Sequence, residues 1–365
     1  MTTHASYKVS RRDFLKLMGV AVAATEISAC NPSSSNVYRP GDAEVPQSLK
    51  IDTHQHYIPP NYAKWLDSQG IKFSGMVLPP WDKAAAVKMM DKHEIQVGIL
   101  SIAPPGVHFG DDRAARTMAR EVNEFAAEVV ATGSGRFGFF ATLTLPDVEG
   151  AINELNYAMD QLHADGVILL ANAGGTYLGD KLFEPLLVEL NRRESVVFIH
   201  PGYLPGPEVP GVPPFVADFL LDTTRAAANL YLSGALIKYP KIKYILAHGG
   251  GFVPYAAHRL SFPRLQYGGL AALNPKKFLE TELDVFRKLY FDTALSSSPT
   301  TLPSLLSLAD ANHITYGSDW PFAPEGLVSA FDSMLQSYSL DDAQRAAINH
   351  GTAGNLFAGL ALGKP

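Results

Sequence analysis

From Leu49 onward, short runs of apolar residues alternate with longer stretches in which apolar and polar positions are mixed. The short runs are almost continuously apolar, which is typical of strands that are covered on both faces. The longer stretches, such as 111–132 and 149–164, have the apolar spacing of helices packed on one side. The expected strands are residues 49–52, 97–102, 136–143, 166–171, 195–200, 243–248, 288–293 and 314–319.

This alternation predicts an α/β fold with a parallel sheet, and eight strand–helix units fit a closed (β/α)8 TIM barrel. An open doubly wound sheet is the main alternative, but no glycine-rich phosphate loop follows the first strand. The segment 201–219 is too rich in proline and glycine for a helix, so we expect a loop over the site. We therefore predict one catalytic domain at residues 49–365.

Residues 1–30 have the features of an export signal and do not belong to the predicted barrel. Arg11 and Arg12 precede a short apolar stretch that is followed by small residues. The apolar stretch is too short to cross a bilayer as a helix. The arginine pair resembles the signals of the twin-arginine route. We expect an exported protein that resides in the periplasm or at the cell surface.

The only cysteine, Cys30, ends the sequence "ISAC". This sequence resembles a bacterial lipobox, in which the cysteine becomes lipidated, and simple cleavage near Ala29 is the alternative. Residues 31–48 then form a polar, disordered tether. We expect contact with a membrane only through this lipid anchor.

The composition, with 47% apolar and 18% charged residues among 365, is that of a globular protein. The formal net charge is −6, and no basic run is present. Nucleic acid is therefore not an expected partner, because nothing would neutralise its phosphates.

Histidines and one carboxylate follow the predicted strands at the places where a barrel enzyme carries its chemistry. His54 and His56 follow the first strand, His200 ends the fifth, His248 ends the sixth and Asp319 ends the eighth. Residues two apart in a strand point to the same side, so His54 and His56 can both face the barrel mouth. The intervening Gln55 points away.

Three imidazoles and one carboxylate suit a divalent cation. We expect one ion held by His54, His56, His200 and Asp319, with Zn²⁺ as the first expectation and Mn²⁺ as the alternative. Each residue taken alone has a plainer interpretation, such as the end of a strand, a tight turn or a helix cap. Their joint occurrence at the same end of several strands favours the metal site.

Four motifs, "DTHQH", "IHPGY", "AHGGGFVPYAAHR" and "YGSDWPF", together resemble the amidohydrolase superfamily. Within it they are similar to metal-dependent carboxy-lyases related to aminocarboxymuconate-semialdehyde decarboxylase. The segments "SIAPPGVHFGDD" and "GVILLANAGGTYLGD" further resemble the subgroup of 6-methylsalicylate decarboxylases. The resemblance implies the same four metal ligands and proton transfer by His248 and Asp319. It also implies a homodimer in which Arg259 reaches the substrate carboxylate of the neighbouring subunit.

Two reactions remain open. The first is non-oxidative decarboxylation of a hydroxylated aromatic acid, or of a related unsaturated carboxylic acid. The second is hydrolysis of an amide or lactone at the same single ion. A binuclear centre is disfavoured because the end of the fourth strand, "ILLANAGG", offers no lysine or carboxylate. A non-catalytic ligand-binding lipoprotein is disfavoured as well, because no metal residue is missing.

Aromatic and basic residues beside the motifs are candidates for binding the small-molecule substrate. We expect Arg259, Trp320 and Phe252 to contact it, and His108 to line the cavity from the loop after the second strand. Tyr203 and Phe322 could complete a pocket for an aromatic ring, although barrel packing explains such residues equally well.

Overall fold

A computed structural model describes residues 48–71, 78–267 and 274–357 of the chain. The predicted signal, Cys30 and almost all of the predicted tether lie outside these residues, so their assignments stay predictions. Among the helices within the described ranges, none is both long and apolar enough to pass through a bilayer.

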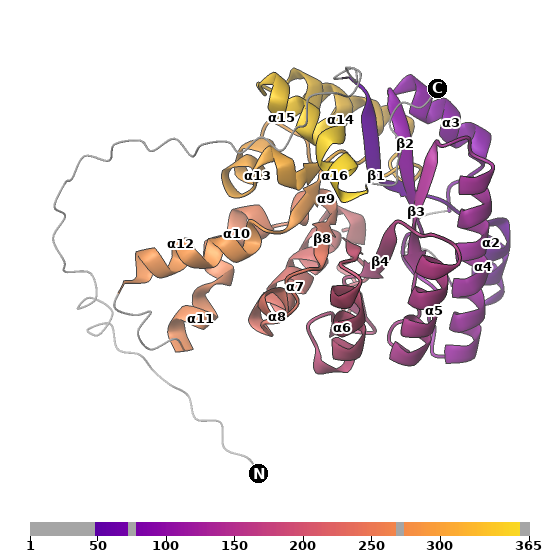
Figure 1. Cartoon of the computed structure of the whole chain (residues 1–365), viewed down its shortest axis with the longest axis horizontal. Helices are drawn as coiled ribbons and strands as arrows, with labels where there is room; N and C mark the ends of the chain where they lie inside the picture. Colours follow the sequence, from indigo (N-terminus) through magenta and orange to yellow (C-terminus); the bar gives the residue numbers. More distant parts are fainter. Residues whose placement is uncertain (1–47, 72–77, 268–273, 358–365) are drawn as a thin grey trace, which may run out of the picture. The chain divides into compact units, whose positions relative to one another are not determined.

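Eight parallel strands form a barrel with helices between them (Figure 1), which confirms the predicted fold. Their order around the sheet is β1-β2-β3-β4-β7-β8-β9-β10, so each strand pairs with the next one along the barrel. A separate two-stranded hairpin consists of β5 (Asn172–Ala173) and β6 (Thr176–Tyr177). The barrel strands are β1 (Lys50–His56), β2 (Ile95–Ser101), β3 (Phe137–Thr142), β4 (Gly166–Leu170), β7 (Val196–His200), β8 (Lys243–Leu246), β9 (Tyr290–Asp292) and β10 (Ile314–Thr315).

The barrel closes where the chain after β10 runs along β1. The backbone N–H of His56 donates to the carbonyl of Trp320 at 2.8 Å, and that of Asp319 donates to the carbonyl of His54 at 2.8 Å. The predicted strand 314–319 is therefore regular only as far as Thr315, and its remainder follows β1 in irregular form. Three of the predicted metal ligands, His54, His56 and Asp319, therefore take part in the closure of the barrel.

The predicted helices 111–132 and 149–164 correspond to α4 and α5. Each begins after an aspartate, Asp111 or Asp147, whose side chain accepts a hydrogen bond from a first-turn backbone N–H. The helices are α2 (Pro60–Ser68), α3 (Lys83–Lys92), α4 (Asp112–Ala131), α5 (Val148–Asp160), α6 (Glu184–Arg192), α7 (Asp218–Leu232), α8 (Ala235–Lys238), α9 (Ala247–Gly250), α10 (Val253–Leu260), α11 (Phe262–Tyr267), α12 (Pro275–Phe286), α13 (Leu302–Leu308), α14 (Glu325–Ser337), α15 (Asp342–Ala346) and α16 (Thr352–Leu356).

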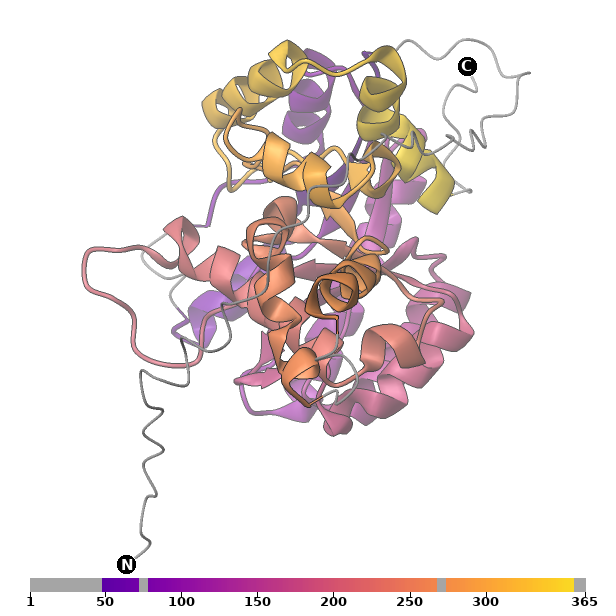
Figure 2. The same ribbon diagram turned by 90° about the vertical axis from the view of Figure 1, so that its left-hand side faces the viewer.

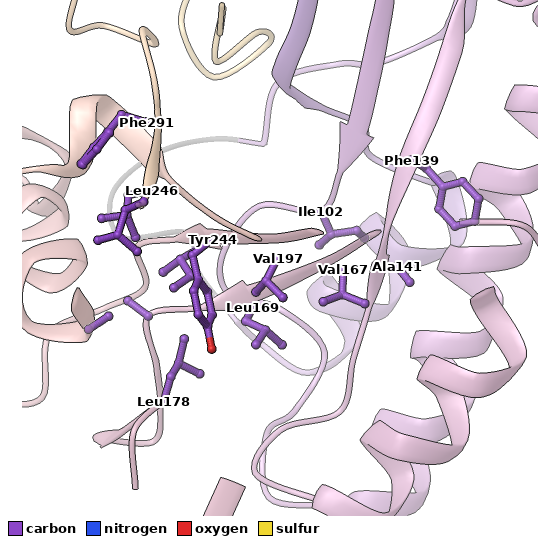
Figure 3. Close-up of a cluster of buried hydrophobic side chains, with 14 of the residues drawn as sticks. Ile102, Phe139, Ala141, Val167, Leu169, Leu178, Val197, Tyr244, Leu246 and Phe291 are labelled. Atoms are coloured by element: carbon purple, nitrogen blue, oxygen red, sulfur yellow. The ribbon is translucent and has the colours of Figure 1, made fainter. Parts of the chain in front are cut away.

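Alternate residues of the strands supply two separate apolar clusters. One set packs between the strands and the surrounding helices and includes Phe139, Val167, Val197 and Tyr244 (Figure 3). The other set packs inside the barrel against α16 and includes Phe140, Ile168, Phe198 and Ile245. The Phe198 ring lies 4.8 Å from the His54 ring, so the apolar interior ends directly at the predicted metal ligands. The polar chemistry is thereby confined to the mouth.

The proline- and glycine-rich segment after β7 is a loop up to the short 3₁₀ helix Pro214–Val216. Figure 2 shows it extending outward from the barrel, and its residues 205–213 are exposed. Its first residues are anchored, because the N–H of Gly202 donates to Asp222 at 2.8 Å and Asn172 donates to the carbonyl of Tyr203 at 2.9 Å. The loop thus leaves the barrel immediately after His200 from a fixed base.

Candidate metal centre

The four predicted metal ligands come together at the mouth of the barrel. His54, His56, His200 and Asp319 are buried, and one donor atom from each lies within 4.8 Å of the others. The Nε2 atoms of His54 and His56 are 3.1 Å apart. Asp319 Oδ1 lies 3.1 Å from His56 Nε2 and 3.3 Å from His54 Nε2. Gln55 between the two histidines is directed elsewhere, toward Gly98 of β2.

Backbone carbonyls orient two of the imidazoles. His56 Nδ1 lies 3.2 Å from the carbonyl oxygen of Ser101, and His200 Nδ1 lies 2.8 Å from that of Pro201. A carbonyl oxygen only accepts hydrogen bonds, so each Nδ1 carries the hydrogen. The Nε2 lone pair of each ring consequently faces the centre of the cluster.

The third imidazole is oriented by a carboxylate that we did not predict as a site residue. His54 Nδ1 lies 2.7 Å from Asp292 Oδ2, and both side chains are fully buried. Asp292 is the last residue of β9, the seventh barrel strand. The signal in the sequence is an acidic residue at a strand end, the same rule that identified Asp319.

The donor set fits a divalent cation. One nitrogen of each imidazole and a carboxylate oxygen lie close together in a buried space, where their lone pairs repel unless a cation or a proton lies between them. Three nitrogen donors and one oxygen donor are the ligands that Zn²⁺ and similar ions accept in catalytic sites. Hydrogen bonds from the other ring nitrogen to Ser101, Pro201 and Asp292 fix the orientation of the three imidazoles, as is usual for histidines that bind a metal.

Burial and mutual charge set the protonation of the ligands. Burial lowers the pKa of His56, and burial together with the neighbouring imidazoles lowers that of His200 well below its ordinary value. Burial alone would raise the pKa of Asp319, but hydrogen bonds from His248 and His54 hold it well below the usual range. At neutral pH these residues are neutral imidazoles and a carboxylate, the forms that bind a metal.

His54 is the exception. Burial lowers its pKa, but the charge and hydrogen bond of Asp292 outweigh this and raise the pKa to about 10. The metal-free cluster therefore carries a proton on His54 at neutral pH. Binding of the cation releases that proton, so metal affinity rises with pH.

His248 lies beside the four ligands in a turn of the backbone. Its Nε2 is 3.5 Å from Asp319 Oδ2, and its backbone φ of 57° is in the left-handed region. Asp319 also has a left-handed φ, 60°. These two residues are strained positions at a functional site, held there by the surrounding hydrogen bonds. The predicted strand 243–248 ends at Leu246 because the chain turns at this point.

Glycines make this turn possible. Gly251 has φ 60° and ψ −122°, a conformation that is essentially restricted to glycine. A Cβ atom at this position would lie 2.2 Å from the carbonyl oxygen of Leu220 in α7. Gly251 of the "HGGG" motif is therefore a structural requirement for the turn that places His248 between the strand and the helix.

A second carboxylate that was not predicted, Asp52, links the first barrel strand to the segment after the last one. It accepts hydrogen bonds from the backbone N–H groups of His54 and Ser318, each at 3.0 Å, and from Ser318 Oγ at 2.5 Å. Burial raises the pKa of Asp52 to about 7, although these donors lower it. The residue fixes the backbone next to His54 and next to Asp319 at the same time.

Aromatic rings border the ligands on two sides. The Phe322 ring lies 5.3 Å from the His56 ring, and the Phe219 ring lies 6.3 Å from that of His200. Tyr203 packs at 6.4 Å against Phe219. Phe322 and Tyr203 were predicted as pocket residues, whereas Phe219 was not, because it is the last residue of a segment predicted as loop.

The other candidate substrate-binding residues occupy more varied places. Trp320 is buried and forms the bridge that closes the barrel beside Gln55. In the loop after β2, His108 Nε2 lies 2.8 Å from Oδ1 of Asp112, the first residue of α4. Phe252 is 39% exposed at the start of α10, and Arg259 is exposed on the same helix. Their roles in substrate binding remain predictions.

The chain is similar to known proteins over most of its length and most of theirs. Residues 51–358 match the family model described as amidohydrolase. Decarboxylase yanB of Aspergillus niger is 37% identical over 326 residues, which cover 84% of this chain and 87% of the relative. The 6-methylsalicylic acid decarboxylase of Penicillium expansum is 36% identical over 317 residues, covering 84% of this chain and 96% of the relative.

Solved structures agree with the fold. A crystal structure of an amidohydrolase II superimposes with a TM-score of 0.76 at 29% identity, covering 85% of this chain and 99% of the other. A dihydroxybenzoic acid decarboxylase from Polaromonas, solved with manganese and an inhibitor, has a TM-score of 0.67 at 24% identity. That match covers 85% of this chain and 97% of the other.

Proposed function

Since the chain belongs to the amidohydrolase family, we propose that it is a metal-dependent carboxy-lyase acting on a hydroxylated aromatic acid similar to 6-methylsalicylate, or on a related unsaturated acid. The observation that carries the proposal is the single His₃Asp centre with His248 beside it. The decarboxylases with 36% and 37% identity over most of their length support it. β4 ends at Leu170 and is followed by Ala171 and Asn172, so this strand end supplies no ligand for a second ion.

A divalent cation held by the four ligands would supply Lewis-acid chemistry by polarising the carboxylate and phenolate oxygens of the substrate. The residues of the chain then have to deliver a proton. His248 is placed to hold it, because its Nε2 faces Asp319 Oδ2 and its Nδ1 has no hydrogen-bond partner within the described ranges. The low pKa of Asp319 makes this carboxylate the acceptor of the pair at neutral pH.

The reaction balances with one proton and no redox partner. The proton held by His248 and Asp319 is transferred to the ring carbon that carries the carboxylate. The bond between that carbon and the carboxylate then breaks, its electron pair restores the aromatic ring, and CO₂ leaves. His248 regains a proton from solvent. Phe322 and Phe219, which border the ligands, are suited to holding the flat ring above the centre.

The identity of the ion is part of the proposal. Zn²⁺ is our first expectation from the donor types. Mn²⁺ is the alternative, and the manganese in the Polaromonas relative supports considering it. Both ions accept nitrogen and oxygen donors, and supply contributes to which is bound.

The proposed function is tested by incubating protein of known metal content with 6-methylsalicylate and a panel of hydroxybenzoates. We expect stoichiometric CO₂ and the corresponding phenol, for example 3-methylphenol from 6-methylsalicylate. The matched control is the same panel of benzoates without a hydroxyl group next to the carboxylate. Inactivity on the whole panel, together with turnover of lactones or amides, would instead establish the mononuclear hydrolase.

We also propose that the enzyme works as a homodimer through one stripe of α10 and its flanks. Phe252, Tyr255, Arg259 and Phe262 follow one another at spacings of three, four and three residues, which places them on one helical face. All four are exposed, and Tyr255 is 88% exposed. Exposed aromatic residues around an arginine are typical of an interface core. A second copy of the chain would cover this stripe and use Arg259 to hold a carboxylate.

Replacing Arg259 by alanine is expected to raise KM for the acid about 10- to 100-fold, because a charged hydrogen bond to a carboxylate contributes roughly 1.5–3 kcal/mol. Steady-state kinetics on CO₂ release checks this, and sedimentation velocity reports the association state. Arg113→Ala is the matched control, since Arg113 is an exposed arginine on α4, across the barrel from α10 in Figure 1. The shared site would be refuted if the wild-type protein were a monomer and Arg259→Ala had the same KM as the wild type.

The export signal and lipid anchor remain part of the proposal on sequence grounds. Arg11 and Arg12 support the twin-arginine route, and the position of Cys30 supports lipidation, with cleavage near Ala29 as the alternative. A periplasmic or cell-surface enzyme attached by its lipidated N-terminus would meet aromatic acids outside the cytoplasm.

A further inference from the structure

We propose that Asp292 is a positioning residue that governs both the metal ligand His54 and the proton-transfer residue His248. The inference rests on the metal site of the proposed function. Asp292 is not one of the four ligands, and the proposed mechanism gives it no contact with the substrate. Asp292 is completely buried at the end of β9. Its two oxygens face different parts of the site.

Each carboxylate oxygen of Asp292 has its own partners. Oδ2 lies 2.7 Å from His54 Nδ1. Oδ1 accepts from the backbone N–H of His248 at 2.8 Å and from that of Ala294 at 3.0 Å. Both carboxylate oxygens thus have partners, and neither oxygen can move away without losing a buried hydrogen bond.

The contact with Oδ2 fixes which nitrogen of His54 can bind a metal. An ionised carboxylate only accepts, so His54 Nδ1 must carry the hydrogen. When the cation is bound, the Nε2 lone pair of His54 is then directed at it. His56 and His200 differ, because each has a backbone carbonyl opposite Nδ1. Of the three histidine ligands, His54 is the one whose Nδ1 faces a side-chain carboxylate instead of a backbone carbonyl.

The contact with Oδ1 fixes the backbone of His248. The left-handed φ of 57° at this residue is uncommon for any residue other than glycine. The hydrogen bond from its N–H to Asp292 offsets part of that strain and holds the ring 3.5 Å from Asp319. One carboxylate therefore couples the geometry of metal binding to that of proton delivery.

The variant Asp292→Asn removes the negative charge of the side chain and keeps nearly the same size and shape. Its amide oxygen can keep accepting from His248 and Ala294, because the reverse orientation would set an NH₂ group against two backbone N–H donors. The amide nitrogen then faces His54 and donates to Nδ1. This moves the ring hydrogen to Nε2, where it points at the metal position and blocks ligation.

We expect the Asn variant to fold and to bind Zn²⁺ and Mn²⁺ about 10- to 100-fold more weakly than the wild type, as for other partners of ligating histidines. Competition with a chelating dye measures the dissociation constant without any substrate. Nitrogen NMR of the imidazoles should place the His54 hydrogen on Nε2 in this variant. Asp165→Asn is the matched control: its carboxylate is also largely buried and accepts a backbone N–H, from Phe139, but it contacts no ligand.

Asp292→Glu is the second variant, because it keeps an ionised acceptor. It should bind the ion more tightly than Asp292→Asn, even where the longer side chain lowers the melting temperature. Equal affinity of wild type and Asp292→Asn, or equal weakening in Asp165→Asn, would overturn the inference. Since metal affinity is measured without turnover, a failed decarboxylation assay would leave this result intact and would count against the proposed reaction alone.

Discussion

Removal of the divalent cation is expected to abolish CO₂ release, and addition of Zn²⁺ or Mn²⁺ to restore it. Without the cation, the mouth of the barrel presents the Asp319 carboxylate and the imidazole groups, with no divalent ion to attract an anionic substrate. Lewis-acid stabilisation of several kcal/mol is lost with the ion, so the rate should fall by a factor on the order of 10³ or more. Measured metal content and initial rates should rise together during reconstitution.

The substitution His200→Ala should reproduce this loss and prevent its recovery by added metal. The substitution removes one of the four metal ligands. Pro201, whose carbonyl oxygen faces His200 Nδ1, is not changed. A wild-type sample that retains its full rate after the ion has been stripped to trace levels would contradict the metal-dependent reaction. The same samples should differ in melting temperature, because an ion that binds only the folded chain stabilises it.

Replacing His248 by asparagine is expected to lower kcat about 10²- to 10⁴-fold, the usual contribution of a positioned acid or base. Metal content should be unchanged, because the four ligands remain. Asparagine is the informative replacement, since it tolerates the left-handed backbone of this residue better than alanine does. A loss in kcat with nearly constant KM would identify a group that acts in the transition state.

The matched control is His163→Asn, which makes the same substitution at an exposed residue with a similar φ of 56°. This variant should keep the wild-type rate. If His248→Asn instead lost its metal and recovered full activity with excess ion, His248 would be a fifth ligand and the proton would have to come from another group.

The sequence predicted the barrel and the meeting of its strand ends because both follow from simple repeats. Continuous apolar runs separated by amphipathic stretches predict parallel strands with helices outside, and carboxyl ends of such strands share one mouth. His54, His200 and Asp319 could therefore be grouped although they lie far apart in the chain. The structure brings them within ligand distance of one another.

Features that depend on individual hydrogen bonds could not be predicted in this way. β8 ends earlier than its apolar run suggested because the chain turns at His248, and β10 ends early because the residues after Thr315 follow β1 only irregularly. Asp292 also lies at a strand end, but the sequence pattern does not show that its carboxylate contacts His54. Phe219 lies where a loop was expected, and only the start of α7 at Asp218 brings it to His200.

The closure of the barrel between β1 and the chain after β10 has a consequence for biosynthesis. His56 and Asp319 are separated by 263 positions, so a growing chain cannot offer the complete ligand set until Asp319 has left the ribosome. Complete metal binding must then wait until the last barrel strand and Asp319 have been synthesised. The ion that the enzyme acquires is decided by the ions available in the compartment where the last strand docks beside the first.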